Sequence, residues 1–296
     1  MKKIYYLNDN KIGHLRQSEG LAKALQQLLG DEVGIESIPA FSLWQYLISF
    51  GRCAQKINKN SIVIGAGHRT HFGLIYYRFK YSAKNIVIMK PSLPKSWFSY
   101  CIIPRHDNVT EKDNIIITEG AMNALSMQNA EKENQLIILI GGPSDSCAWN
   151  NESIYRQLLI KLRSINIRIK IILSTSRRTP VEFISNLPKE ISDKVQVIDF
   201  KTVDIAWLPA QLLKSHEAWI TSESISMVYE ALSANCLVQT IDVDSLKGKI
   251  AQNINHLTQL GLINSNTMNN KRLNESLRVA EKLLELGLIN NGITEK

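Results

Sequence analysis

Three polar loops in the second half of the sequence combine glycines, hydroxyls and arginines in a way that suits a bound diphosphate. Gly141-Gly142-Pro143-Ser144 follows one apolar run, Thr175-Ser176-Arg177-Arg178 follows the next, and a third loop covers residues 221–227. Glycines let the backbone approach a pyrophosphate, arginines neutralise it, and hydroxyls of the third loop can cap a following helix whose N-terminus adds N–H donors. We therefore expect a nucleotide here, with Glu223 or Glu230 accepting a hydrogen bond from a hydroxyl group. The residues expected to hold it are Gly141, Gly142, Ser144, Arg177, Arg178, Glu223, Ser224, Ser226, Met227 and Glu230.

Acid and base chemistry has two candidate positions in the first half. Asp9 and His14 lie in the polar stretch after the first apolar run, and His106 and Asp107 follow a later one. A group that removes a proton from a hydroxyl is typically a histidine or a carboxylate whose pKa suits the task. We expect Asp9 or His14 to be catalytic and keep the His106 and Asp107 pair as the alternative. All four are expected to face a cleft between two domains.

The turn Gly65-Ala66-Gly67-His68-Arg69-Thr70 begins like a dinucleotide-binding fingerprint. Thr70 stands in place of the third glycine, however, and no acidic residue follows before Asp107 to bind a ribose. We therefore expect no NAD site at this turn. The residues expected to contact an acceptor substrate instead are His68, Arg69, Arg105 and His106.

No sequence motif indicates a metal or another cofactor. Asp242-Val243-Asp244 matches the metal-binding motif Asp-x-Asp. No third ligand is nearby in sequence, however, and hard cations need several converging oxygens. The absence of a Walker loop, HExxH, GxSxG and paired-cysteine zinc spacing disfavours an ATPase, a zinc hydrolase and a serine esterase. We expect neither a metal ion nor a cofactor.

Positive charge is concentrated in the first half of the chain. Residues 1–124 hold 16 Lys and Arg against 9 Asp and Glu and so carry +7 of the net charge of +8. Residues 37–106 contain no acidic residue and hold 12 of the 21 aromatic residues. Such a surface attracts an anionic partner, such as membrane lipid, a phosphorylated glycolipid or nucleic acid. We favour an anionic or lipidic partner. The basic residues of this window are Arg52, Lys56, Lys59, Arg69, Arg78, Lys80, Lys84, Lys90, Lys95 and Arg105.

Apolar runs followed by Gly, Pro or polar residues predict buried parallel strands. Helical spacing predicts a helix near residues 17–29 and another whose face carries Val228 and Leu232, with Asn235 ending it in the left-handed conformation. A last helix is expected in the tail from residue 269, with Leu284 on its buried face. The predicted strands are residues 3–7, 61–64, 85–89, 100–103, 114–118, 136–140, 168–174, 195–200, 218–221 and 237–241.

This order of elements predicts an α/β protein with two Rossmann-like doubly wound domains. We place the acceptor-side domain at residues 1–130 and the nucleotide-binding domain at residues 131–296, which includes the tail as a closing helix. Residues 128–135 are expected to form the linker. The length of 296 residues and the hydrophobic content of 44% are enough for both cores.

The composition also indicates a compartment. The four cysteines form no CxxC pair, as in proteins of a reducing compartment. Polar residues 8–11 interrupt the apolar start too early for a signal peptide, and the longest strongly apolar run, residues 136–140, is too short to span a bilayer. We expect a soluble cytoplasmic protein, at most associated with the cytoplasmic face of the inner membrane.

Several motifs in collinear order, over nearly the whole chain, resemble the mitochondrial-fission ELM-like family. The most specific are Gly141-Gly142-Pro143-Ser144 and the pattern Ser-x-Ser-Met-x-x-Glu-Ala that begins at Ser224. Ser222-Glu223 stands where members commonly have Ala-Asp, and Asn235 stands where glycine is usual. The other shared motifs are Asp9-Asn10-Lys11-Ile12-Gly13-His14, Pro104-Arg105-His106-Asp107, Thr118-Glu119-Gly120-Ala121 and residues 174–178.

This resemblance implies the two-domain GT-B architecture, in which the second domain holds a sugar nucleotide and the first binds the acceptor, usually without a catalytic metal. Bacterial members are regarded as glycosyltransferases, some of them in lipopolysaccharide outer-core assembly. The resemblance therefore implies hexosyl or N-acetylhexosaminyl transfer from a nucleoside diphosphate donor to an anionic glycolipid, with peripheral contact to the inner membrane and no nucleic acid partner. Two alternatives stay open. One is a sugar-nucleotide epimerase of the same fold, which the basic, aromatic-rich residues 37–106 disfavour. The other is a noncatalytic interaction protein at a membrane.

Overall fold

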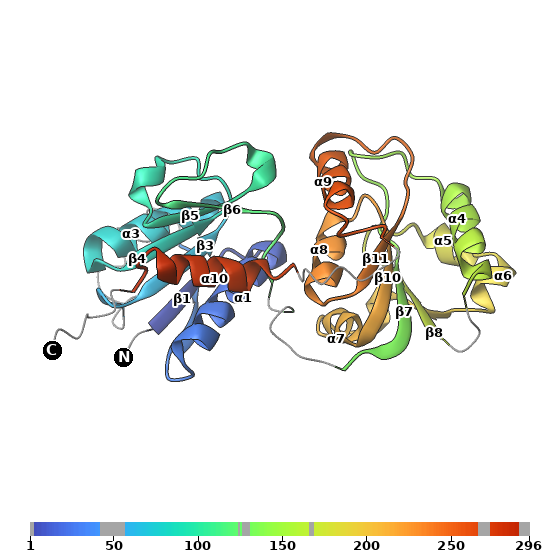
Figure 1. Cartoon of the computed structure of the whole chain (residues 1–296), viewed down its shortest axis with the longest axis horizontal. Helices are drawn as coiled ribbons and strands as arrows, with labels where there is room; N and C mark the ends of the chain where they lie inside the picture. The colour runs from blue at the N-terminus through green and yellow to red at the C-terminus, as the bar shows by residue number, and fades with distance from the viewer. Residues whose placement is uncertain are drawn as a thin grey trace. The chain divides into compact units, whose positions relative to one another are not determined.

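The computed structural model describes residues 3–41, 57–123, 125, 131–165, 169–265 and 273–289. The chain divides into two units, one made of Met1–Met127 with Asn274–Lys296 and the other of Gln128–Leu273. Each unit is a parallel β-sheet covered by helices (Figure 1). Within the described ranges, no helix has the length and apolar character needed to cross a membrane.

The first unit contains a six-stranded parallel sheet in the order β2-β1-β3-β4-β5-β6. Its strands are β1 (Lys3–Asn8), β2 (Gly34–Pro39), β3 (Ile62–Ala66), β4 (Lys84–Ile88), β5 (Tyr100–Pro104) and β6 (Ile115–Thr118). All but β2 correspond to apolar runs predicted from the sequence. The sequence did not predict β2, because this edge strand is half-buried or exposed along its whole length and so has no continuous apolar run.

Helices cover both faces of this first sheet. α1 (Ile12–Leu29) and α10 (Glu275–Glu285) pack on one face, where Ile4 and Leu25 are buried. α3 (His71–Tyr81) packs on the other face, where its Leu74 shares a buried core with Tyr5 of β1. α1 begins at Ile12, five residues before the start that the sequence predicted. His14 therefore lies in the first turn of a helix and not in a loop.

α10 belongs to the first unit, which corrects the expected second domain of residues 131–296. Val279, Ala280 and Leu283 are fully buried in the core that α1 and the first sheet share. Leu284, which was expected on the buried face, is half-buried and packs against the same core. The closing helix thus completes the unit in which the chain began.

The second unit has a five-stranded parallel sheet in the order β11-β10-β7-β8-β9. Its strands are β7 (Glu133–Leu139), β8 (Lys170–Ser174), β9 (Gln196–Ile198), β10 (Ser215–Thr221) and β11 (Leu237–Ile241). β7 begins inside the expected linker of residues 128–135, which is therefore shorter than predicted. Its helices are α4 (Asn151–Arg163), α5 (Val181–Ser185) and α6 (Lys189–Ser192) on one face, α7 (Trp207–Lys214) and α8 (Ile225–Ser233) on the other, and α9 (Gly248–Gln259) beside α8.

In each sheet the winding of the chain reverses at one place. β1 lies between β2 and β3 in the first sheet, and β7 lies between β8 and β10 in the second. Open α/β sheets bind ligands at the carboxyl edge where the winding reverses, because the neighbouring loops there separate to opposite faces. Asp9 and His14 follow β1, residues 141–144 follow β7, and residues 222–224 follow β10 and lead into α8. The Asp9 and His14 candidates and two of the three predicted loops of the second unit therefore lie at these two switch points.

α8 ends as the sequence predicts. Asn235 has a φ of 62°, and the N–H groups of Asn235 and Cys236 donate to the carbonyls of Leu232 and Ala231, each at 3.0 Å. This pair of bonds is the Schellman pattern, in which a left-handed residue closes the helix.

We expect Asn235→Ala to lower the free energy of unfolding by about 1 kcal/mol, because the short polar side chain of asparagine can offset the cost of the left-handed conformation by hydrogen-bonding locally and that of alanine cannot. Asn235→Gly has no Cβ and is expected to hold or raise stability. Thermal denaturation of both variants measures the difference. Equal midpoints for the alanine and glycine variants would contradict this account of the helix end.

Candidate functional site

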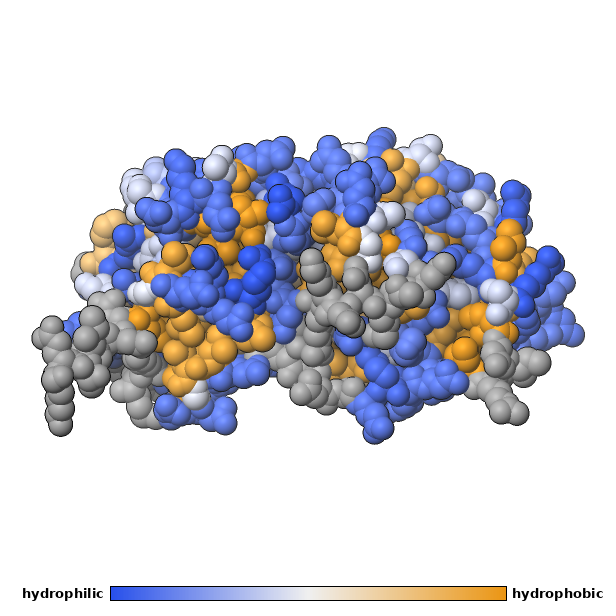
Figure 2. All heavy atoms as spheres, in the orientation of Figure 1, coloured by the Kyte–Doolittle hydropathy of each residue, from blue (hydrophilic) through white to orange (hydrophobic). Residues whose placement is uncertain are grey.

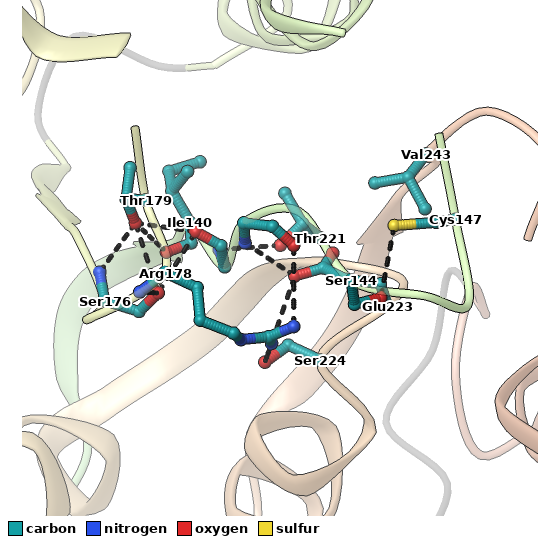
Figure 3. A network of polar contacts seen from close by, with 12 residues as sticks. Ile140, Ser144, Cys147, Ser176, Arg178, Thr179, Thr221, Glu223, Ser224 and Val243 are labelled. Carbon is teal, nitrogen blue, oxygen red and sulfur yellow. Dashed lines mark hydrogen bonds and ion pairs between the residues drawn. The ribbon is translucent and has the colours of Figure 1, made fainter. Parts of the chain in front are cut away.

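Three loops of the second unit meet at the switch point between β7 and β10 (Figure 3). The Gly142 N–H donates to Glu223 Oε1 at 2.9 Å, which joins the loop after β7 to the loop after β10. Arg178 comes from the loop after β8, and its Nη2 lies 3.4 Å from Glu223 Oε1 and 3.3 Å from Ser224 Oγ. The loops that the sequence analysis grouped thus lie together in space.

Gly141 and Gly142 have a packing role that the sequence analysis did not anticipate. A Cβ on Gly141 would overlap Glu223 Oε1, and a Cβ on Gly142 would overlap the carbonyl oxygen of Arg178. Both N–H groups are also occupied: that of Gly141 donates to Thr221 Oγ1 at 2.8 Å and that of Gly142 to Glu223. The glycines therefore let the three loops pack together, and their N–H groups do not present open donors to a pyrophosphate.

Glu223 is buried within this junction. Its residue is 2% exposed, and its Oε2 has no hydrogen-bond partner among the described residues. Burial raises the pKa of Glu223 above the ordinary value of 4.5, while the Gly142 N–H, Thr221 and Arg178 act in the opposite direction. A carboxyl group held this way fastens the loops to one another. Glu230, the other glutamate expected to accept a ligand hydroxyl, is half-buried on α8.

The raised pKa of Glu223 predicts a pH-dependent effect of Glu223→Gln. Because the folded state favours the protonated carboxyl, the stability that neutral Glu223 contributes is fully present below pH 4.5 and is lost as the pH rises through the raised pKa. Glutamine keeps an acceptor for Gly142 without a charge. We therefore expect the melting temperature of Glu223→Gln, relative to wild type, to be higher at neutral pH than at pH 4.5.

Thermal denaturation at the two pH values measures this effect, and Glu182→Gln, which alters an exposed glutamate of the same unit, is the matched control. A difference between Glu223→Gln and wild type that does not vary with pH would contradict the prediction.

Arg178 provides positive charge at this switch point. Its side chain is 42% exposed, and its contacts to Glu223, Ser224 and the Gly142 carbonyl measure 3.3–3.5 Å. Charge-assisted hydrogen bonds are typically about 2.7–2.9 Å long, so the guanidinium is held loosely and is accessible to an anion. Arg177, on the same loop, is exposed.

The N-terminus of α8 lies beside this guanidinium. The Ser224 hydroxyl was expected to help cap the helix, but it does not do so, and it accepts from Arg178 instead. The N–H groups of Met227 and Val228 both donate to the Ser224 carbonyl. Among the described residues, the N–H groups of Ile225 and Ser226 have no backbone acceptor, and they are the open donors of the first turn.

The remaining predicted residues of this group lie nearby with different surroundings. Ser226 is exposed and Met227 half-buried in the first turn of α8. Ser144 serves its own loop, since its Oγ accepts from the Ser146 N–H at 3.3 Å and lies 3.5 Å from Cys147 Sγ. The structure therefore brings Arg178, Ser224 and the start of α8 together and leaves Ser144 outside these contacts.

A hollow of about 540 Å³ opens on the same unit, between the loop after β7, the start of α4 and the loop after β11. Trp149 gives it an aromatic ring, and Glu152 and Asp244 give it two carboxylates. Carboxylates accept hydrogen bonds from hydroxyls and repel phosphates. The chemistry of this hollow suits an uncharged sugar better than a diphosphate.

Asp9 and His14 form a pair at the switch point of the first unit. His14 Nδ1 lies 2.8 Å from Asp9 Oδ2, and Asp9 Oδ1 accepts from the Lys11 N–H at 3.1 Å. Asp9 is only 6% exposed, so its position and that of the imidazole are fixed. When Nδ1–H donates to Asp9, Nε2 carries the lone pair that can take a proton. A Cβ on Gly67 would overlap the imidazole, and this glycine therefore lets the ring lie against the loop after β3.

Two acceptor-side candidates follow β3. His68 and Arg69 are exposed on the short helix η1 (His68–Thr70), at the edge of the sheet next to the Asp9 and His14 pair. His71, the next histidine, is 3% exposed and packs edge-on against Phe98. Burial, and then the neighbouring His68, lower the pKa of His71. Its surroundings are those of a core residue.

The other two acceptor-side candidates follow β5, on η3 (Arg105–Asp107). Arg105 Nε donates to both carboxylate oxygens of Glu119, at 2.8 and 2.7 Å. The Glu119 N–H in turn donates to Glu275 Oε2 of α10 at 2.9 Å. His106 Nε2 lies 3.9 Å from Asp107 Oδ1. Arg105 is thus tied into the contacts that hold α10 and is a weaker candidate for binding an acceptor than Arg69.

Two hydroxyl groups, whose contacts were not predicted from the sequence, hold the second-unit loops together. Thr179 Oγ1 lies 2.8 Å from the Ile140 carbonyl and 2.6 Å from that of Gly141, and Ser176 Oγ donates to Gly141 at 3.1 Å. The available signal was the pair of hydroxyls that brackets the arginines of this loop. In the described part of the chain, no group of three or more His, Cys, Asp or Glu side chains is arranged to hold a metal ion.

Comparison with known families matches residues 12–286 to the family described as mitochondrial fission ELM1. The chain belongs to this family. The resemblance inferred from the motifs is therefore confirmed over nearly the whole sequence of this ELM1-family chain. A search of curated protein sequences finds no match.

Solved structures similar to the ELM1-family chain share its fold. The UDP-GlcNAc 2-epimerase from Methanocaldococcus jannaschii matches with a TM-score of 0.56 at 14% identity, covering 96% of this chain and 100% of that one. The UDP-GlcNAc 2-epimerase from Neisseria meningitidis bound to UDP-GlcNAc gives 0.56 at 11% identity, covering 97% and 100%. The S. aureus MnaA–UDP co-structure gives 0.52 at 14% identity, covering 96% and 88%. The predicted α/β class with two Rossmann-like units of the GT-B type is confirmed.

Proposed function

We propose that this chain is a glycosyltransferase that moves a hexose or N-acetylhexosamine from a nucleoside diphosphate donor to a lipopolysaccharide core or a related anionic glycolipid. The observation that carries the proposal is the open Arg178 guanidinium beside the N-terminus of α8 at the switch point between β7 and β10. A guanidinium and free N–H groups at one place form a site for a diphosphate. The solved relatives that contain UDP or UDP-GlcNAc support the choice of ligand.

In the proposed reaction, Asp9 orients His14 so that Nε2 takes the proton of an acceptor hydroxyl. The hydroxyl oxygen then bonds to the anomeric carbon of the sugar, and the bond from that carbon to the diphosphate oxygen breaks. Arg177, Arg178 and the first N–H groups of α8 stabilise the charge that develops on the leaving diphosphate. Positive charge for the diphosphate thus comes from the chain itself, and we propose metal-independent transfer.

The acceptor is proposed from the charge of the first unit. Residues 37–106 hold ten basic residues and no acidic one, which suits an anionic glycolipid, and the exposed His68 and Arg69 adjoin the Asp9 and His14 pair. Arg52 and Lys56 of this window lie outside the described residues. A lipid-linked acceptor of this kind is met at the cytoplasmic face of the inner membrane, which is the location we propose.

An epimerase is the second candidate, because the similar solved structures named above include UDP-GlcNAc 2-epimerases. The purified chain, incubated with UDP-sugars and with glycolipid from a strain that lacks it, distinguishes the two. A glycolipid mass increase of one sugar supports transfer, and conversion of the UDP-sugar without glycolipid supports epimerisation. If no donor is turned over and vesicle binding is retained, both enzyme hypotheses fail and the result supports a noncatalytic interaction protein.

A further inference from the structure

The outer face of α3 carries exposed aromatic side chains. Phe72 is 44% exposed and Phe79 is 69% exposed. Half-buried Tyr76 lies between them, four residues after Phe72 and three before Phe79, so all three side chains lie on one helical face. On the opposite face, Leu74 and Tyr77 are fully buried. Helices at the surface of a globular protein normally expose polar side chains on this side.

Trp97 is a further exposed aromatic residue, on a segment that contacts α3. It lies on η2 (Lys95–Trp97) and is 43% exposed. The buried Asn85 amide donates to the carbonyls of Leu74 at 3.0 Å and Trp97 at 3.2 Å, which fixes η2 beside α3. We call Phe72, Tyr76, Phe79 and Trp97 the aromatic surface. Figure 2, in the orientation of Figure 1, shows apolar atoms at the left edge, where α3 lies.

Basic side chains border the aromatic surface. Lys80 Nζ donates to the Tyr76 hydroxyl at 2.8 Å and lies 5.1 and 5.5 Å from the ring centroids of Tyr76 and Tyr81. This hydrogen bond raises the pKa of Lys80, so the charge is kept. Arg78 Nη1 donates to the Ser96 carbonyl of η2 at 3.3 Å, and Arg69 is exposed one turn before α3. Aromatic rings interleaved with cations are typical of segments at a membrane interface.

We propose that the aromatic surface docks the chain on an anionic lipid bilayer, with Phe72, Phe79 and Trp97 in the headgroup region and the neighbouring cations on lipid phosphates. A bilayer supplies both the apolar phase and the negative charge that this surface lacks. A second copy of the chain would instead place basic residues against basic residues. The aromatic surface includes neither Asp9 nor His14, and its contact with a bilayer does not depend on sugar transfer.

Vesicle sedimentation with the full chain tests the proposal. We expect binding to vesicles of phosphatidylcholine with phosphatidylglycerol to exceed binding to pure phosphatidylcholine, and to fall as salt rises. Phe79→Asp is expected to lower the vesicle partition coefficient at least about tenfold, because it puts a negative charge where an apolar ring contacted lipid. Phe79→Ala should lower it by a smaller factor.

Val181→Asp is the matched control, since Val181 is an apolar residue of the second unit that is 78% exposed. Its binding should equal that of wild type. Unchanged sedimentation of Phe79→Asp, or equal binding to neutral and anionic vesicles, would overturn the proposal. A dimer in size-exclusion chromatography that Phe79→Asp abolishes would assign the surface to a second copy instead. UDP binding of each variant, measured separately, reports the donor site and is expected to be unchanged.

Discussion

We expect His14→Ala to lower the rate of sugar transfer by a factor of about 10²–10⁴, the usual contribution of a positioned general base. The physical reason is the geometry of the pair: Asp9 Oδ2 lies 2.8 Å from Nδ1, so the free Nε2 is the nitrogen that can take a proton. Asp9→Asn should also be slow, because an amide can donate to Nδ1 and favour the wrong tautomer. Transfer assays with saturating donor and acceptor measure both rates.

The same variants should bind UDP as wild type does, since the donor site is assigned to the second unit. His216→Ala, which removes an exposed histidine of that unit, controls for the loss of an imidazole in general. Transfer by His14→Ala at the wild-type rate would remove the pair from the mechanism. A loss of UDP binding by His14→Ala would place the histidine at the donor instead of the acceptor.

Arg178→Ala is expected to weaken UDP binding about tenfold to a hundredfold. A hydrogen bond to a charged group contributes about 1.5–3 kcal/mol, and about 1.4 kcal/mol corresponds to a factor of ten in affinity. Arg178→Lys keeps the charge but loses the planar fork that matches two phosphate oxygens, so it should recover only part of the affinity. Titration calorimetry with UDP measures these constants.

The variant Arg177→Ala distinguishes the contributions of the two arginines of this loop to UDP binding. The sequence predicts both as donor-binding residues, but among the described contacts Arg178 is the one that reaches Glu223 and Ser224. We therefore expect the smaller loss for Arg177→Ala. Arg163→Ala, at an exposed position of α4, is the control for charge alone. UDP affinity that is unchanged in Arg178→Ala would contradict the assignment of the diphosphate to this switch point.

Strand positions were predictable from the sequence because buried parallel strands are continuous apolar runs. Edge strand β2 was missed because it is half-buried or exposed along its length and has no such run. The unit to which α10 belongs was also not predictable, since an amphipathic helix shows which side is apolar but not which sheet covers it. The existence of the helix was correct, and its assignment to residues 131–296 was wrong.

The sequence indicated which residue types lie at the candidate site better than it indicated their contacts with one another. Apolar runs and the loops after them gave the carboxyl edges, and parallel sheets bring such loops together. The roles of Gly141 and Gly142 depend on Glu223 and Arg178, which are distant in sequence and adjacent only in the folded chain. His14 was placed in a loop because Asn8 to Lys11 is polar, whereas the helix begins at the apolar residue Ile12.

The discontinuity of the first unit orders events during synthesis. When the ribosome has released residues 1–127, α1 can cover its part of the sheet face, but the apolar surface that α10 covers is still exposed, because α10 is translated only after the whole of the second unit. The second unit is continuous in sequence and can finish folding first. Until then the nascent first unit exposes apolar surface that can bind chaperones or aggregate. Completion of the amino-terminal half thus waits for the arrival of the carboxyl-terminal helix.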